Sequence, residues 1–156
     1  MTPQISAYLE RFSEGLPTAD NVQDVKEKAV AAFDSGNCEQ AIPLLDAMAT
    51  QSNALANLMS QTLNPFYDGG FDERENFNIS SVDELIANET LNNALLVDRN
   101  SAWVMLGECE LKNGNEDRAL GYFSKALDYI SLDTKELDSW KRAANGIMQI
   151  SGVSNQ

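Results

Sequence analysis

The chain has 156 residues, 43% of them hydrophobic, which is enough for one domain with a real core. No apolar run approaches the ~18 residues that a membrane-spanning helix requires. The formal net charge is −13, from 24 acidic and 11 basic residues with no histidine. This balance repels phosphate backbones and anionic lipids and attracts basic proteins, so we expect neither nucleic acid nor membrane as a partner. Solubility alone is the other explanation of the charge.

The two cysteines, Cys38 and Cys109, are too few for a disulfide framework and lack the spacing of a metal site. Both are expected to be small interior or boundary residues. The first six residues contain neither a basic region nor a long apolar one, so no signal peptide is recognised. These features together predict a reduced, cytoplasmic protein.

A first helix is predicted over residues 3–16. Thr2 supplies a capping hydroxyl, and Pro3 lies in the first turn, where its missing N–H costs nothing. Apolar side chains then recur at helical spacing, at Ile5, Tyr8, Leu9, Phe12 and Leu16. Because soluble monomers rarely expose such a stripe, we expect this helix to pack on its neighbours, to occupy a groove or to form a homodimer with a second copy.

A pair of helices is predicted over residues 22–50, with a turn at Gly36. The first helix carries Val25 and Ala29 on one side, and the second carries Ala41 and Leu45.

A second pair is predicted from a helix over 52–63 and a helix ending at residue 98. Leu63-Asn64-Pro65 is expected to stop the first of them. The segment 64–80 is then an inserted loop, and long irregular loops in compact domains tend to be functional or disordered. Its aromatic side chains argue against disorder and are candidate binding residues: Phe66, Tyr67, Phe71 and Phe77.

The clearest pattern lies over 101–112 and 116–130, two helical stretches joined by Asn113-Gly114-Asn115. Small and large apolar residues alternate there as a close helical pair requires: Trp103, Leu106, Gly107, Gly114, Ala119, Phe123 and Ala126. We expect Trp103 to be buried against Ala94, Phe123 and Ala126. A hairpin of this kind cannot bury its apolar faces alone, so it predicts stacked neighbours.

This run of residues resembles the tetratricopeptide repeat (TPR), with Ser131 where that family usually has proline. Gly36, Ala41 and Leu45 match the same pattern, and a further match ends with Arg99 at the usual proline position. The resemblance implies an all-α, right-handed superhelical stack of antiparallel helix pairs. About three repeats are expected, over 22–50, 52–98 and 100–133.

Residues 134–150 are predicted as a capping helix, because a solenoid needs a last helix that hides the final repeat and presents a polar face to water. Its expected apolar face consists of Leu137, Trp140, Ala144, Ile147 and Met148.

The resemblance also implies a binding face, since the first helices of tetratricopeptide repeats line a concave groove. Carried over residue by residue, the groove consists of Gln23, Lys26, Val30, Phe33, Asp34, Ser101, Val104, Glu108, Leu111 and Lys112. Its apolar floor and acidic surroundings favour a protein or peptide with apolar anchors and basic flanks.

No catalytic residue, metal or cofactor is expected. Histidine, the commonest general base and metal ligand, is absent. The carboxylates Asp68, Asp72, Glu73 and Glu75 do not have the spacing of a calcium-binding EF-hand loop.

The sequence therefore predicts a non-catalytic protein–protein interaction scaffold or adaptor. Two alternatives stay open. The chain also resembles the small tetratricopeptide chaperones of bacterial secretion systems, and the N-terminal helix would suit a structural self-assembling module.

Overall fold

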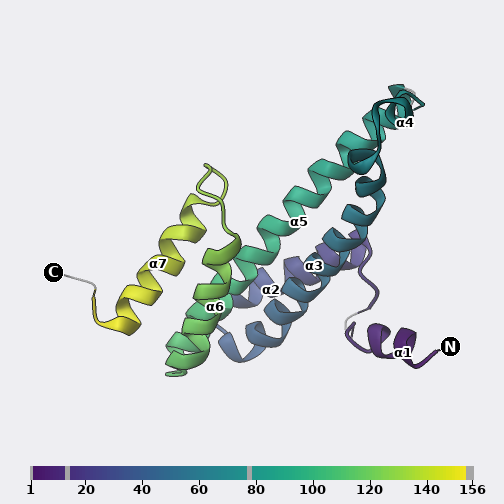
Figure 1. The fold of residues 1–156 in the computed structure, drawn as a ribbon. Helices are drawn as coiled ribbons and strands as arrows, with labels where there is room; N and C mark the ends of the chain where they lie inside the picture. The colour runs from purple at the N-terminus through teal and green to yellow at the C-terminus, as the bar shows by residue number, and fades with distance from the viewer. Residues whose placement is uncertain (1, 13–14, 77–78, 154–156) are drawn as a thin grey trace.

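The computed structural model describes residues 2–12, 15–76 and 79–153, and within these ranges the chain is all-α without a strand (Figure 1). The all-α prediction is confirmed. The helices of the described residues are α1 (Pro3–Leu9), α2 (Ala19–Asp34), α3 (Cys38–Asp68), α4 (Phe71–Glu75), α5 (Ile79–Lys112), α6 (Glu116–Tyr129) and α7 (Leu137–Ser151). None of these helices is both long enough and apolar enough to cross a bilayer.

Two antiparallel hairpins, α2–α3 and α5–α6, turn in the same way. Gly36 and Gly114 have φ of 80° and 82°, the left-handed conformation that glycine adopts without strain. The N–H of Asn37 donates to the Ala32 carbonyl at 3.1 Å, and the N–H of Asn115 donates to the Glu110 carbonyl at 2.9 Å. Two of the three predicted helical pairs, those with turns at Gly36 and Gly114, are therefore present with matching turns.

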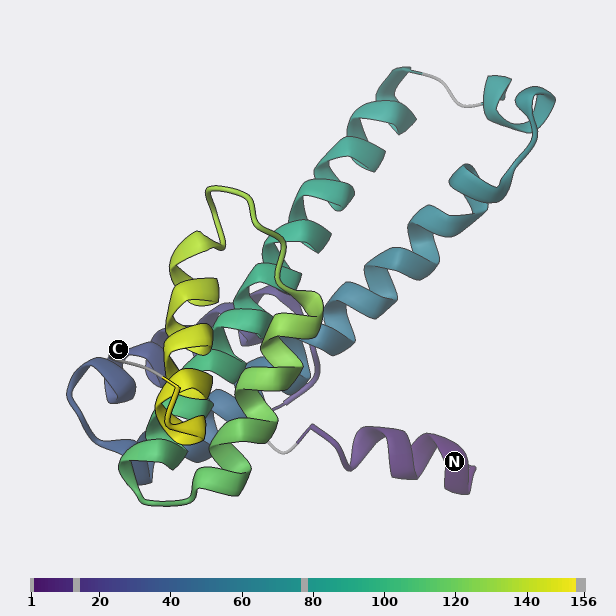
Figure 2. The same ribbon diagram turned by 60° about the vertical axis from the view of Figure 1, so that its left-hand side comes forward.

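The helices between these turns are longer than predicted. Helix α3 runs for 31 residues and α5 for 34, so the expected breaks at residues 51 and 99 are absent. No glycine or proline lies near either position, and Arg99 stands where a proline would have ended the helix. Helices α3 and α5 therefore form one long antiparallel hairpin, which projects beyond the other helices (Figure 2).

The predicted loop 64–80 is also largely helical. Helix α3 continues past Pro65 to Asp68, and the short α4 follows. Proline lacks the N–H that would donate to the Gln61 carbonyl, so Pro65 removes one backbone hydrogen bond from this part of α3 without ending the helix. Arg74 compensates at this end, because its Nε donates to the Phe66 carbonyl at 2.9 Å and its Nη2 donates to the Tyr67 carbonyl.

Helices α5, α6 and α7 meet at the ring of Phe123. This side chain is fully buried and lies between Gly107 of α5 and Gly146 of α7. A Cβ atom on either glycine would lie under 3.0 Å from the ring, which real Cβ atoms essentially never do. The close approach of α7 to α5 therefore depends on two positions without side chains.

Trp103 is buried, as predicted, in the same core as Phe123 and Ala126. Its ring lies 5.7 Å from that of Tyr129, with the Arg99 guanidinium at 4.7 Å and the Lys125 ammonium at 4.6 Å from its centroid. The expected contact with Ala94 is wrong, because Ala94 is exposed on the continuous helix α5.

Buried polar side chains link α3, α5 and the start of α7 in the middle of the molecule. Arg99 donates to Asn53 of α3 at 2.8 Å and to its neighbour Asn100. Asn100 in turn donates to Glu136 at 2.9 Å, and Glu136 also accepts from the backbone and hydroxyl of Ser131. Burial lowers the pKa of Arg99. This network satisfies groups that would otherwise be costly to bury, and it fixes the start of α7 on α5.

The packing face of α7 is the predicted one only in part, since Ile147 packs against the core as expected. Ala143 and Gly146 are its buried residues, since Gly146 must face Phe123. This orientation leaves Leu137, Trp140 and Met148 exposed, with Trp140 at 36%. Trp140, which we expected on the apolar packing face and hence in the core, is therefore not a core residue.

The cysteines are not separate thiols, because Cys38 and Cys109 form a disulfide with a Cα–Cα distance of 5.4 Å. The bond links the start of α3 to the last turns of α5, across 71 residues of sequence. Such a separation leaves no recognisable spacing in the sequence, which is why the pairing was not predicted.

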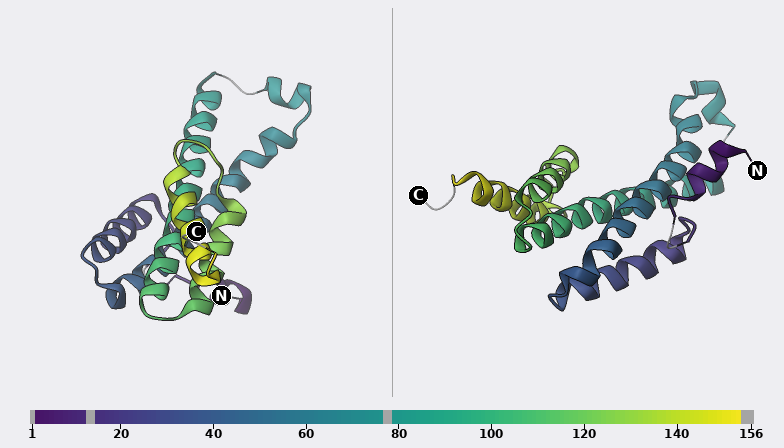
Figure 3. Two further views of the ribbon diagram at one scale, coloured as in Figure 1. Left: turned by 90° about the vertical axis from the view of Figure 1, so that its left-hand side faces the viewer. Right: turned by 90° about the horizontal axis from the view of Figure 1, so that it is seen from below.

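The N-terminal helix is shorter than predicted and lies beside the bundle, where it contains no buried residue (Figure 3). Phe12, just beyond its end, is buried at 9% exposure. Gln51 of α3 holds the following turn, because its Nε2 donates to the Gly15 carbonyl at 3.0 Å. The segment therefore packs on the molecule mainly through Phe12.

Replacement of Gly146 by alanine tests the contact around Phe123. We expect Gly146→Ala to destabilise the protein by about 1–3 kcal/mol, because the new methyl group must displace the ring. Gly121→Ala is the matched control: it lies in α6 with open space around it, and should stabilise the protein by about 0.5–1 kcal/mol. Urea unfolding measures both changes, and an equal effect of the two substitutions would contradict this packing.

Reduction of the disulfide should destabilise the fold by about 4 kcal/mol, because a closed loop of this length restricts the unfolded chain. The measurement is urea unfolding with and without a reducing agent. A Cys38→Ser/Cys109→Ser variant should match the reduced wild-type protein and should not respond to the reducing agent. Two titratable thiols in the unreduced native protein would show that the bond is not formed.

Candidate functional site

The groove residues predicted from the sequence lie on or beside one face, formed by α2, α5 and α7. Lys26 of α2 forms an ion pair with Asp98 of α5 at 2.9 Å. Lys112 of α5 donates to the Gly36 carbonyl at 3.3 Å, across the disulfide-linked end of the molecule. We call this surface the inner face.

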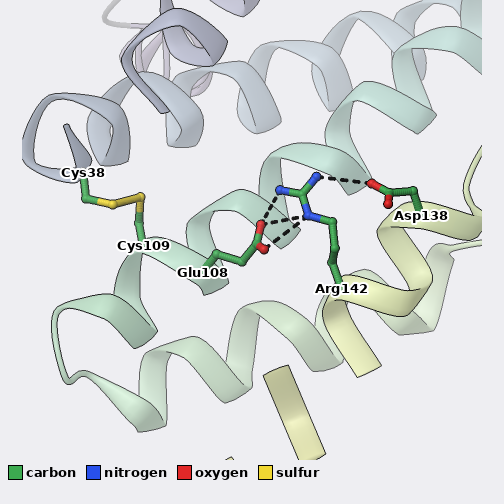
Figure 4. Close-up of polar contacts among 5 residues, drawn as sticks. All are labelled: Cys38, Glu108, Cys109, Asp138 and Arg142. Carbon is green, nitrogen blue, oxygen red and sulfur yellow. Dashed lines mark hydrogen bonds and ion pairs between the residues drawn. A yellow bond between two sulfur atoms is a disulfide. The ribbon is translucent and has the colours of Figure 1, made fainter. Parts of the chain in front are cut away.

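The Arg142 side chain of α7 extends over the inner face toward Glu108 (Figure 4). Its Nε donates to both carboxylate oxygens of Glu108, at 3.1 and 3.2 Å, and its Nη1 lies 3.5 Å from Asp138. Its guanidinium also lies 5.7 Å from the centroid of the Phe33 ring. The hydrogen bonds with Glu108 raise the pKa of Arg142. The negative charge of Glu108 is therefore already paired within the molecule.

Several predicted groove residues are only partly available to a partner. Val104 is fully buried, and Val30, Phe33 and Leu111 pack against the core with part of their surface exposed. Ser101 is half-buried, whereas Gln23, Asp34 and Lys112 are exposed. The space that remains between α5 and α7 is a depression of about 380 Å³ beside Arg142.

A larger cleft, of about 460 Å³, lies between α3 and α6. We call it the outer cleft. Trp103 of α5 lies at its floor, and Tyr122 and Lys125 of α6 form one wall. The other wall is a single face of α3: Asp46, Ala49, Thr50, Asn53, Ala54, Asn57, Leu58 and Gln61.

The N-terminal segment of the chain enters this cleft. Tyr8, Arg11 and Phe12 line it, and the Tyr8 and Phe12 rings meet edge to face with centroids 5.3 Å apart. Phe12 is the buried member, while Tyr8 remains 40% exposed. The outer cleft therefore accepts one aromatic side chain of its own chain and keeps open space beside it.

Sequence reasoning did not identify the outer cleft. It placed Trp103 in the core, where most of the ring does lie, and it assigned binding to the opposite face. The helical spacing of Asn53, Asn57 and Gln61 was the available indication, because three amide side chains one turn apart form a polar row on one helix face.

Of the aromatic loop candidates, Phe66 is half-buried under the Arg74 guanidinium, and Tyr67 donates to Glu89 of α5 at 2.7 Å. This hydrogen bond raises the pKa of Tyr67. Phe71 is 76% exposed, and Phe77 lies outside the described residues. The acidic residues predicted not to form a calcium loop lie in or next to α4, and the described residues contain no cluster of three potential metal ligands.

Comparison of the chain with protein-family models, curated proteins and solved structures found no match.

Loss of the Phe12 side chain should release the N-terminal segment. Burial of a phenylalanine is worth about 1.5–3 kcal/mol, so Phe12→Ala should speed tryptic cleavage after Arg11 by at least about tenfold. Ile5→Ala serves as the control, because Ile5 is exposed in α1 and its loss should change the cleavage rate little. Equal cleavage rates in the wild-type protein and in both variants would show that Phe12 does not anchor the segment.

Proposed function

We propose that the protein is a non-catalytic protein-binding scaffold of tetratricopeptide-like construction, which holds a segment of its partner in the outer cleft. The observation that carries this proposal is the position of Phe12. A side chain from a short N-terminal segment is seated against the cleft, whereas the helix that precedes it has no buried residue. The cleft thus accommodates an aromatic anchor without requiring an extensive interface.

The chemistry of the cleft suits a peptide. Trp103 supplies an aromatic floor on which a ring or aliphatic side chain packs favourably. The amides of Asn57 and Gln61 are exposed on the α3 wall, and amide side chains both donate to and accept from a peptide backbone. The net charge of −13 speeds the encounter with a basic partner, although the charged side chains of the cleft itself are Arg11, Lys125 and Asp46.

The inner face is less well suited to the same role. An incoming basic peptide would have to displace Arg142 from Glu108, which leaves one charged group without its partner. The exposed groove residues Gln23 and Asp34 provide polar surface but no apolar anchor site.

Self-association is a second candidate function, favoured by the exposed apolar residues at the two ends of the chain. Ile5 and Tyr8 of α1 and Trp140 of α7 are each at least one-third exposed. Phe12 is not free for the dimer surface first predicted, since it packs on its own molecule. The mass of the protein in solution separates this function from partner binding.

A cytoplasmic location remains a prediction from the sequence. The disulfide favours an oxidising compartment, because cytoplasmic reductants normally keep cysteines as thiols. A secretion-system chaperone also remains a prediction from the sequence resemblance.

Site-specific photo-crosslinking in the native cell tests the proposed function. A photoreactive residue replaces Asn57 on the α3 wall, and the control replaces Asp24 on the exposed side of α2. We expect a defined adduct from position 57 alone, joined to a partner segment that contains an aromatic residue.

A cleft-filling substitution provides the matched comparison. Ala54→Phe places a ring in the outer cleft and should abolish the adduct, whereas Ala31→Phe on the exposed surface of α2 should leave it unchanged. An adduct that persists in Ala54→Phe, or that forms equally from position 24, would overturn the assignment of the outer cleft.

A further inference from the structure

The projecting end of the α3–α5 hairpin is a second surface, separate from the outer cleft. At its base the two helices pack through a small core that contains Leu55, Ala56 and Leu95. Farther out, buried contacts become sparse, with Leu63 as the last residue of α3 that is buried. Helix α4 lies at the end of the projection (Figure 2).

The described residues of this projecting end expose apolar side chains. Val82 and Ile86 are four residues apart, so they lie on the same face of α5, and Glu89 continues that face by one turn. Tyr67 of α3 is joined to this face by its hydrogen bond with Glu89. Ile86 is 56% exposed and Phe71 of α4 is 76% exposed. We call Tyr67, Val82 and Ile86 the tip patch, and Phe71 is a further exposed apolar residue of the projecting end.

Carboxylates are concentrated in the segment that carries the tip patch. Between residues 64 and 90 the sequence has Arg74 as its one basic residue, and its acidic residues are Asp68, Asp72, Glu73, Glu75, Asp83, Glu84 and Glu89. The segment therefore carries nearly half of the net charge of −13 in about a sixth of the chain. The Arg74 guanidinium is directed at the Phe66 and Tyr67 carbonyls, so its hydrogen bonds are made within the tip.

We propose that the tip patch docks onto a partner protein whose surface has an apolar recess bordered by lysine and arginine side chains. Burial of the apolar side chains supplies affinity, and the surrounding carboxylates orient and speed the approach of a basic surface. The same charge opposes the alternative occupants. Anionic lipid and nucleic acid are repelled, and two copies of this tip repel each other.

A defined peptide tests the chemistry of this surface in the full-length protein. The probe is an amphipathic helical peptide of lysine and leucine, and its control is a peptide of the same charge with serine in place of leucine. Backbone amide NMR shifts locate the binding site. We expect shifts from the first peptide at residues 67–76 and 82–90, at least about tenfold weaker binding of the second, and weakening of both by added salt.

Substitutions on the protein complete the test. Val82→Ser with Ile86→Ser should weaken binding of the lysine–leucine peptide by at least about tenfold, with unchanged thermal unfolding since both residues are exposed. Leu120→Ser, an exposed apolar position on α6, is the matched control and should bind as wild type. Ala54→Phe should also leave binding at the tip unchanged, which separates this proposal from the one for the outer cleft.

Four outcomes would overturn the proposal. The first is equal binding of the two peptides, and the second is a set of shifts spread over the whole acidic surface or confined to the outer cleft. The third is binding that the Val82→Ser/Ile86→Ser variant retains in full. The fourth is a tip that, without peptide, associates with a second copy or binds vesicles of anionic phospholipid.

Discussion

The seating of Phe123 between Gly107 and Gly146 is the contact on which the C-terminal half of the molecule depends. The ring is fully buried and touches helices on both sides, so α5, α6 and α7 share one packing centre. Because α7 must present Gly146 to this ring, its orientation is fixed. That orientation directs Arg142 toward Glu108 and leaves Trp140 partly exposed. The inner face is thereby closed in part by the molecule itself.

The long helix α5 connects this packing centre to the other helices of the molecule. Near its C-terminal end it is joined to α6 and α7 by Phe123 and to α3 by the disulfide of Cys109. In its middle, Arg99 and Asn100 link α3 to the start of α7. Its N-terminal part leaves the body beside α3 and supports the tip patch. One rigid element therefore positions both the outer cleft and the projecting tip.

Much of the fold followed from local sequence patterns. The hairpin turns at Gly36 and Gly114, and the small residues of the last helical pair, indicated all-α packing correctly. The wrong predictions concern features that depend on contacts between helices far apart in the sequence. Arg99 in place of proline let α5 continue, and α3 continues past Pro65 to Asp68, where Arg74 binds the Phe66 and Tyr67 carbonyls. The disulfide and the rotation of α7 depend on which helices meet in space, which residue spacing alone does not encode.

The binding surfaces were harder to predict for the same reason. The exposed aromatic character of the tip was recognised from Phe71, but it was assigned to a loop, although the chain there is helical. The outer cleft was not predicted, because the outer part of the α3–α5 hairpin lies between its α3 residues and its α6 residues in the sequence. Its walls become neighbours only because both helices pack on α5.

The continuity of α5 through Arg99 joins the body of the molecule to the projecting end of the α3–α5 hairpin. Backbone carbon chemical shifts of residues 97–101, with amide exchange rates measured on the same sample, test it most directly. A continuous α5 gives helical shifts and slow exchange without interruption across these residues. Extended or turn-like shifts with fast exchange at Arg99 and Asn100 would show instead two separate helices, as in a stack of distinct repeats, and would contradict it.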